Sequence, residues 1–511
     1  MPSFSAKRAA ERPTEIALRD GRSAFTWAET DDKLNRVANA LHAADLGPKR
    51  RIAVFSENGV EVVLAHIGGL VAGCSTVPVN FHLTADEAAY ILEDSQAKVL
   101  FVGPENARAG VEAARKAGVA RVVGWRCEGI DGVEPFDKFL AASSPAACRE
   151  DHAPRPNMLY TSGTTGRPKG TELPPTMFAA GATIAEHIEK LALSPFAAIG
   201  GPHLIVGPLY HTGPLSGSRS IAGGTALVIL GRFDAEAVLR SIHEYKCVSS
   251  VMVPTHFVRL LQLPEAVKAK YDLTSFKLAT HTGAKCPVDV KRKMIEWWGP
   301  IFVDAYGATE VGTTCTITSQ DWLRFPGSVG KTVPPFSPLI VDEDGKELPP
   351  NTEGRLYFVD ATGRGIVYPN DPEKSKSAHL RPGVFTLGEV GYVNEEGFVF
   401  ITDRFSDMVV SGGANLYPAE AEQVLINHPD VVDVACIGIP HAEMGEEMIG
   451  LAIKQPGSTV TSQELVAWCR ERLSHYKCPK RIEFVPDLGR TAAGKINKKK
   501  LRDPYWKNAS A

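Results

Sequence analysis

The feature that most limits the fold of this chain is a regular alternation of short apolar segments with longer amphipathic ones. Residues 51–56, 75–80 and 98–103 are candidates for short buried strands, and residues 60–73 and 84–96 between them fit helices. Parallel strands need a crossover connection, which is usually a helix. The alternation therefore predicts parallel βαβ layers.

The same alternation resumes after residue 171, beginning with a predicted helix over residues 176–193, and it continues to Glu310. Beyond that point proline, glycine and β-forming residues dominate to about residue 400. The last hundred residues have a βαβ-type pattern of their own. The predicted fold class is α/β: residues 1–403 form two doubly wound α/β sheet subdomains and a β-rich barrel-like subdomain, and residues 404–511 form a small α+β C-terminal domain.

The segment YTSGTTGRPKG, residues 160–170, has no hydrophobic periodicity and reads as a functional loop. Glycine lets the backbone approach a ligand closely, and successive amide groups, hydroxyls and the Lys169 ammonium together suit phosphate. The spacing fits neither a Walker A loop nor a GxGxxG fingerprint. A solvated linker is the alternative, but the preceding NMLY segment, residues 157–160, reads as a strand that feeds the loop.

Bulk composition narrows the class of protein. The net charge of the 511 residues is only -3, so nothing in the overall charge favours nucleic acid. Nine scattered cysteines without CxxC or zinc spacing suit a reducing cytoplasm. The N-terminus lacks an apolar signal region, and Glu61 and His66 interrupt the most apolar window, which predicts no signal peptide and no membrane span. Peripheral membrane contact and a homodimer are left open.

Several ordered motifs together resemble the adenylate-forming superfamily of acyl-CoA ligases, adenylation domains and luciferases, over essentially the whole chain. The motifs are YTSGTTGRPKG at 160–170, GPLYH ending at His211, HTGA at 281–284, YGATE at 306–310, FTLGEVGY at 385–392, DRFSDMVVSGGANLYPAEAE at 403–422 and GRTAAGKINKKKLR at 489–502.

The resemblance implies a two-step reaction. A carboxylate attacks the α-phosphorus of Mg·ATP to give an acyl adenylate and pyrophosphate, and the thiol of coenzyme A (CoA) then displaces AMP. ATP, Mg²⁺ and CoA are thus the expected cofactors. Oriented donors and a metal would stabilise the charge that develops on the phosphoryl oxygens.

The resemblance also assigns the adenylation residues. Lys495 is the mobile lysine that bridges the carboxylate and the α-phosphate, and His211 gates the acyl site. Glu310 and the Thr161 hydroxyl are the expected Mg²⁺ ligands. Tyr306 would stack on adenine, and Arg404 would donate a bidentate hydrogen bond to ribose or phosphate. The full ATP-binding set is Thr161, Ser162, Gly163, Thr164, Thr165, Gly166, Lys169, Gly283, Ala284, Asp304, Tyr306, Gly307, Thr309, Glu389 and Arg404.

For the second step the resemblance implies that the C-terminal domain rotates about a hinge, here Ser406, where acidic or lysine residues are commoner. The residues expected to face CoA are Gly412, Gly413, Met444 and Lys477. The usual TGD motif is replaced by Leu387, Gly388 and Glu389, and the longer glutamate predicts weaker ATP binding.

The presumed acyl-pocket segments, residues 178–187 and 213–224, are rich in Gly, Ala and Ser and contain Arg219 as a cation. Small apolar walls predict a bulky hydrophobic acid, namely a medium-to-long fatty, aryl or steroid-like carboxylate. The predicted function is an ATP-dependent, AMP-forming acyl-CoA ligase. Three alternatives stay open: an acyl-AMP ligase that loads a carrier protein, a luciferase-like oxygenase, and a nucleotide binder without catalysis.

Overall fold

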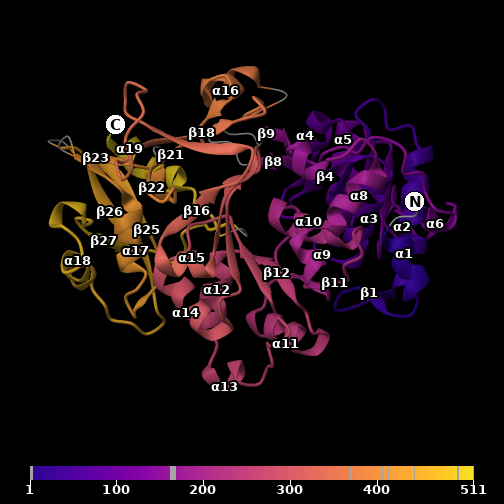
Figure 1. Ribbon diagram of the computed structural model, residues 1–511, viewed down its shortest axis with the longest axis horizontal. Helices are drawn as coiled ribbons and strands as arrows, with labels where there is room; N and C mark the ends of the chain where they lie inside the picture. The colour runs from indigo at the N-terminus through magenta and orange to yellow at the C-terminus, as the bar shows by residue number, and fades with distance from the viewer. Residues whose placement is uncertain are drawn as a thin grey trace.

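The computed structural model describes residues 4–161, 169–368, 371–404, 407–411, 414–441, 444–491 and 494–509. Figure 1 shows three regions that follow one another along the chain, from the indigo N-terminal layers on the right to the yellow C-terminal region on the left. Among the described residues, none of the helices combines the length and the apolar character that a membrane crossing requires.

The first sheet confirms the predicted parallel βαβ layers. Its strand order is β4-β3-β5-β6-β7 and every neighbouring pair is parallel. The strands are β3 (Arg51–Phe55), β4 (Ser75–Val79), β5 (Val99–Val102), β6 (Arg121–Gly124) and β7 (Glu134–Pro135). The covering helices are α2 (Trp27–Ala43), α3 (Val60–Val71), α4 (Ala85–Ser95), α5 (Ala107–Ala117) and α6 (Phe136–Ala141).

Side-chain alternation along β3 shows why this sheet is doubly wound. Ile52 and Val54 belong to the apolar core that includes α2 and α3. Ala53 and Phe55 point to the opposite face and join the core that includes α4 and α5. Because successive side chains of a strand face opposite sides, an uninterrupted apolar strand needs a helical layer on both.

The second sheet begins as an α/β sheet and continues into the β-rich region. β10 (His203–Ile205), β11 (Leu227–Ile229), β12 (Ser249–Met252), β13 (Leu278–His281) and β14 (Phe302–Ala308) are parallel neighbours. β15 (Gly312–Thr318) then returns antiparallel to β14. A tight hairpin adds its second strand to the sheet of the first, so the predicted β-rich piece continues this sheet.

The remaining strands of that sheet complete the region before the C-terminal part. They are β1 (Ile16–Arg19), β2 (Ala24–Thr26), β16 (Ser328–Thr332), β17 (Phe336–Val341), β18 (Gly354–Asp360), β19 (His379–Arg381), β20 (Val384–Phe385), β21 (Glu389–Val393) and β22 (Val399–Arg404). The helices are α1 (Phe4–Glu11), α9 (Pro195–Ile199), α10 (Thr212–Ser218), α11 (Ala235–Tyr245), α12 (Pro254–Leu261), α13 (Glu265–Lys268), α14 (Val288–Trp298), α15 (Ser319–Arg324) and α16 (Pro372–Ser377).

The single helix predicted over residues 176–193 is wrong. The segment forms two helices, α7 (Pro175–Phe178) and α8 (Ile184–Ala192). Gly181 between them has φ of 111°, a conformation that glycine adopts readily and that a helix cannot include. Thr183 then begins α8 as its N-cap, since its hydroxyl accepts a hydrogen bond from the Glu186 amide.

The C-terminal region has its own sheet and core. The strand order is β24-β23-β26-β25, with β27 beside β26. Its elements are β23 (Val409–Ser411), β24 (Ala414–Leu416), α17 (Pro418–Leu425), β25 (Val431–His441), β26 (Gly445–Lys454), α18 (Ser462–Arg470), β27 (Ile482–Phe484) and α19 (Lys498–Ala509). The chain leaves the large sheet at Arg404 and enters this one at Val409, next to the predicted boundary.

Candidate active site

Two paired strands of a β-hairpin flank the glycine-rich segment. β8 (Met158–Thr161) and β9 (Lys169–Glu172) pair antiparallel, with Thr161 opposite Lys169. The predicted feeding strand is therefore confirmed. Ser162, Gly163, Thr164, Thr165 and Gly166, together with the side chain of Thr161, lie outside the described residues.

Lys169 lies in a charged cluster at the base of this hairpin. Its ammonium forms an ion pair with Asp371, which also caps α16 through the Lys374 amide. The hydrogen bond from Lys169 lowers the pKa of the Asp371 carboxyl. Burial lowers the pKa of Lys374, and the nearby charge of Lys169 acts in the same direction. The cluster thus gathers cations where the resemblance expects phosphate.

Glu310 lies against the same cluster. The Tyr368 hydroxyl donates to Glu310 Oε1 over 3.0 Å, and the Arg364 guanidinium donates to the Glu310 carbonyl over 3.2 Å. Tyr368, Arg364 and Asp371 were not predicted from the sequence. They lie in a turn-rich segment, PNDPE and its neighbours, whose composition indicates only a loop.

Magnesium is the metal that the resemblance implies, and the donors suit an ion carried in by ATP. The described residues contain no group of three or more His, Cys, Asp or Glu side chains that would hold a resident metal. Glu310 supplies one carboxylate beside the hairpin. Magnesium in nucleotide enzymes typically binds one or two carboxylates together with substrate phosphates and water.

A cavity of about 280 Å³ lies between the large sheet and the C-terminal region. It brings together several predicted nucleotide residues from the ends of β13 and β14 and from β21. Those that line it are Gly283, Ala284, Asp304, Tyr306, Gly307 and Glu389. Gly283 has φ of 90°, so the turn after β13 depends on glycine. Thr309 lies outside the lining and shares a 3.3 Å hydrogen bond with Thr212, the neighbour of His211.

Glu389 and Arg404 face each other in the antiparallel pair β21 and β22. Glu389 is buried, with 6% of its surface exposed, and it lines the cavity. The register therefore brings the two predicted ribose residues to one place, although the side chain of Arg404 lies outside the described residues.

Lys495 reaches this site from the C-terminal region and also lines the cavity. Its turn is held by Arg490, which pairs with Asp433 and donates to the Gly494 carbonyl over 2.6 Å. Gly494 has φ of 75°, and a Cβ there would lie 2.4 Å from the Thr255 hydroxyl of α12. Only glycine allows the turn to approach α12 this closely.

His211 is the N-cap residue of α10 and is half-buried. Burial, helped by the nearby charge of Lys495, lowers the pKa of the imidazole to about 4. Its Nε2 has no hydrogen-bond partner among the described residues. At neutral pH the site therefore contains a neutral imidazole beside a lysine cation.

Two of the residues predicted for CoA, Met444 and Lys477, lie away from this cavity. Met444 is 43% exposed, and Lys477 forms a 2.8 Å ion pair with Glu420 of α17. Neither lines the nucleotide cavity. Gly412, Gly413 and the predicted hinge residue Ser406 lie outside the described residues.

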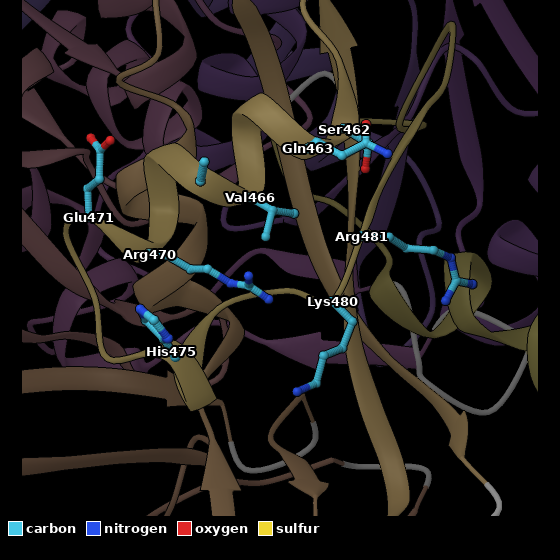
Figure 2. A pocket seen from close by; sticks show the side chains of 9 residues that line it. Ser462, Gln463, Val466, Arg470, Glu471, His475, Lys480 and Arg481 are labelled. Carbon is cyan, nitrogen blue, oxygen red and sulfur yellow. The ribbon is translucent and has the colours of Figure 1, made fainter.

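A second pocket, of about 480 Å³, lies within the C-terminal region and shares no lining residue with the nucleotide cavity. Figure 2 shows Arg470 extending from α18 toward the side where Lys480 lies, with His475 nearby. Arg481, also in the lining, is paired with Glu447 and Glu483. The sequence analysis did not predict this pocket.

Comparisons with known proteins agree with this geometry. The family model of the AMP-binding enzyme matches residues 5–362, and that of the AMP-binding enzyme C-terminal domain matches residues 420–495. A propanoyl:CoA ligase from Rhodococcus jostii, whose acyl group carries a methyl-dioxo-octahydroindenyl ring system, is 31% identical over 97% of both chains. A feruloyl-CoA synthase from an Amycolatopsis species is 32% identical over 98% of both chains.

Among solved structures, ATP-bound MatB from Rhodopseudomonas palustris is 28% identical, covers 99% of both chains and superposes with a TM-score of 0.82. The fold, the order of the motifs and the whole-length sequence identity all indicate the same family. The chain belongs to the AMP-binding enzyme family of the adenylate-forming superfamily and is an AMP-forming acyl-CoA ligase that uses ATP and CoA.

Proposed function

We propose that this ligase activates a hydrophobic monocarboxylic acid of the medium-to-long fatty, aryl or polycyclic type. The observation that carries the proposal is the engagement of Arg219, the cation in the presumed acyl-pocket segments. Its side chain is buried with 2% exposure. It donates to Asn157 Oδ1 over 3.0 Å and to the Phe178 carbonyl over 2.7 Å, and it also contacts His187 Nε2.

These contacts engage both terminal nitrogens of the guanidinium within the protein. It also lies over the Phe178 ring at 4.8 Å, which adds a cation–π contact. A second carboxylate on the substrate would have to displace several buried hydrogen bonds before it could pair with Arg219. The arginine therefore supports the wall of the site and does not select dicarboxylates.

The surrounding residues favour an apolar acyl group. Phe178 and Leu215 pack in an apolar cluster with Leu159 and Leu173, and small residues of α10 lie beside them. Two whole-length relatives are named for a ring-bearing propanoyl group and for a feruloyl group, which supports a bulky or aryl acid here. Hydrophobic pockets with few polar groups bind such acids by area burial.

In the adenylation step, Lys495 would bridge the substrate carboxylate and the α-phosphate while the carboxylate oxygen attacks phosphorus and pyrophosphate leaves. The hairpin of β8 and β9, with Lys169, would hold the leaving pyrophosphate, and Tyr306, Glu389 and Arg404 would hold the nucleoside. Mg²⁺ bound by Glu310 and the Thr161 hydroxyl would offset the developing negative charge. His211 would close the acyl side of the same space.

In the second step the CoA sulfur attacks the acyl carbonyl and AMP leaves. The C-terminal domain, residues 404–511, would rotate about Ser406 to bring Gly412, Gly413, Met444 and Lys477 to the site. The position of Lys495 in the cavity, with Met444 and Lys477 away from it, supports a change of arrangement between the steps.

The cytoplasm is the proposed location, because each of the nine cysteines is a buried free thiol, as is common in reducing compartments. Fractionation of the native host tests this location. A homodimer is a separate prediction, and light scattering on the purified chain measures it.

A panel of acids assayed with ATP and CoA tests the substrate proposal. The panel should contain acetate, a dicarboxylate, fatty acids of increasing length, a cinnamate-type acid and a polycyclic propanoate, with AMP and acyl-CoA both measured. We expect the highest kcat/KM among the hydrophobic acids. Turnover confined to acetate, propionate, dicarboxylates or amino acids would refute the proposal. A parallel assay with a carrier protein in place of CoA separates the two acceptors.

A further inference from the structure

The buried side of Asp304 carries an unusual pair of neighbours. Lys291 of α14 is completely buried, yet its Nζ lies 3.5 Å from Asp304 Oδ2. His281 of β13 is also completely buried, and its Nδ1 lies 3.7 Å from Asp304 Oδ1. Fully buried lysines are rare and costly unless a charged partner compensates them. The structure therefore holds the buried ammonium of Lys291 next to the Asp304 carboxylate.

The cation of this group is the lysine and not the histidine. Burial lowers the pKa of His281 to about 4, so its ring is neutral at physiological pH. The ammonium of Lys291 also lies over the Trp322 ring at 4.9 Å, which fixes it from a second side. Both Asp304 and Trp322 line the nucleotide cavity, whereas Lys291 lies behind them.

Asp304 is placed to meet a purine. It lies two residues before Tyr306 on β14, so the two side chains share one face of the strand, and both line the cavity. A base stacked on Tyr306, as the proposed function requires, would bring its edge toward Asp304. A carboxylate accepts hydrogen bonds, so it matches the 6-amino group of adenine and opposes the 6-oxo group of other purines.

We infer that Lys291 is a positioning residue that gives this enzyme its selectivity for a 6-amino purine, by holding Asp304 as a charged acceptor toward the base. Without the ammonium, the Asp304 carboxylate loses the buried donor that fixes one of its oxygens and can turn away from the base edge. A carboxylate that has turned away no longer opposes a 6-oxo group. The inference rests on the proposed nucleotide site and adds a residue that does not touch the ligand.

The test compares ATP with inosine triphosphate, whose base carries a 6-oxo group in place of the 6-amino group. In the Lys291→Met variant, the ratio of kcat/KM for ATP to that for inosine triphosphate should fall by about tenfold or more, because one buried charged hydrogen bond sets the preference. Lys291→Arg should restore most of the ratio. A merely structural role would lower kcat/KM for both nucleotides equally and leave the ratio unchanged, which would overturn the inference.

Asp304→Asn provides a second route if Lys291→Met folds poorly. An asparagine carries no charge and needs no cation beside it. Adding Lys291→Met to Asp304→Asn should therefore change the ratio of kcat/KM for ATP to that for inosine triphosphate by less than twofold. If the effects of the two substitutions on this ratio multiply, the residues act independently and the inference is contradicted. Thermal unfolding of each variant reports folding. Equilibrium displacement of a fluorescent ATP analogue by the two nucleotides measures the selectivity without an acid substrate. This result therefore does not depend on whether the proposed class of acid is correct.

Discussion

The charge of Lys495 acts on His211 although the two residues belong to different regions of the fold and lie far apart in the chain. The lysine ammonium adds to the effect of burial in lowering the pKa of the His211 imidazole to about 4. The turn that carries Lys495 packs against α12 through Gly494. This relationship is the one that the proposed adenylation step requires, and it yields the first prediction.

Replacing Lys495 with alanine should impair only the adenylation half-reaction. We expect acyl-AMP formation to fall by about 10²–10³, because a positioned cation stabilises the charge that develops at the α-phosphate. Formation of acyl-CoA from preformed acyl-AMP should persist. Pyrophosphate release measures the first step, and thioester formation from supplied acyl-AMP measures the second. Lys500→Ala, an exposed lysine of α19, is the matched control. Equal loss of both steps would contradict a step-specific role.

Asp371 forms an ion pair with Lys169, the cation proposed to bind pyrophosphate. Asp371→Asn should free the ammonium and lower the KM for ATP by a few-fold, since a partly exposed ion pair contributes little. Lys169→Met should raise that KM. Glu373→Gln, an exposed acid on the same helix, serves as the comparison. If the KM for ATP rises in Asp371→Asn, the aspartate supports nucleotide binding instead of competing with it.

Glu389 stands at the proposed ribose position with one methylene more than the family's usual aspartate. We expect Glu389→Asp to bind ATP more tightly than the parent, by a few-fold, because fewer rotamers need to be fixed. Glu389→Gln, which keeps the length and loses the charge, should bind ATP more weakly. Titration of ATP in the absence of acid measures both. Weaker binding by Glu389→Asp would show that the surrounding structure has adapted to glutamate.

Acid should destabilise the enzyme through its buried histidines. Six have a pKa lowered by burial to about 3 or 4: His66, His187, His203, His211, His256 and His281. Between these values and the ordinary 6.5, the unfolded chain binds more protons than the folded one. Stability is therefore full above pH 6.5 and falls toward pH 4, by up to about 1.4 kcal/mol per pH unit for each histidine.

The urea midpoint at pH 7.5 and pH 5 measures this effect. We expect a clear drop at pH 5, and a smaller drop for His211→Gln than for the parent. His475→Gln, at an exposed position, should leave the pH dependence unchanged. A midpoint that stays constant or rises at pH 5 would show that these rings carry a proton in the folded enzyme.

Local sequence patterns determined most of the elements. The capping boxes at Thr26 and Thr84 begin α2 and α4 through contacts with a glutamate three residues further along the chain. The apolar residues 52–55 of the first predicted strand agree with a sheet that is covered on both faces. By contrast, Gly181 ended a helix inside a sequence of good helix formers, because its positive φ is set by packing around it and not by local propensity.

The sequence by itself determined the chemistry available, since the motifs from residue 160 to Lys495 contain the anion-binding loop, the carboxylates and the cations of an adenylate-forming ligase. Only the tertiary structure decided which groups meet. The pairing of Lys169 with Asp371, the burial of Arg219 and the position of Lys291 behind Asp304 all join distant segments. Such contacts depend on sheet register and helix packing, which are non-local and leave no pattern within any one segment.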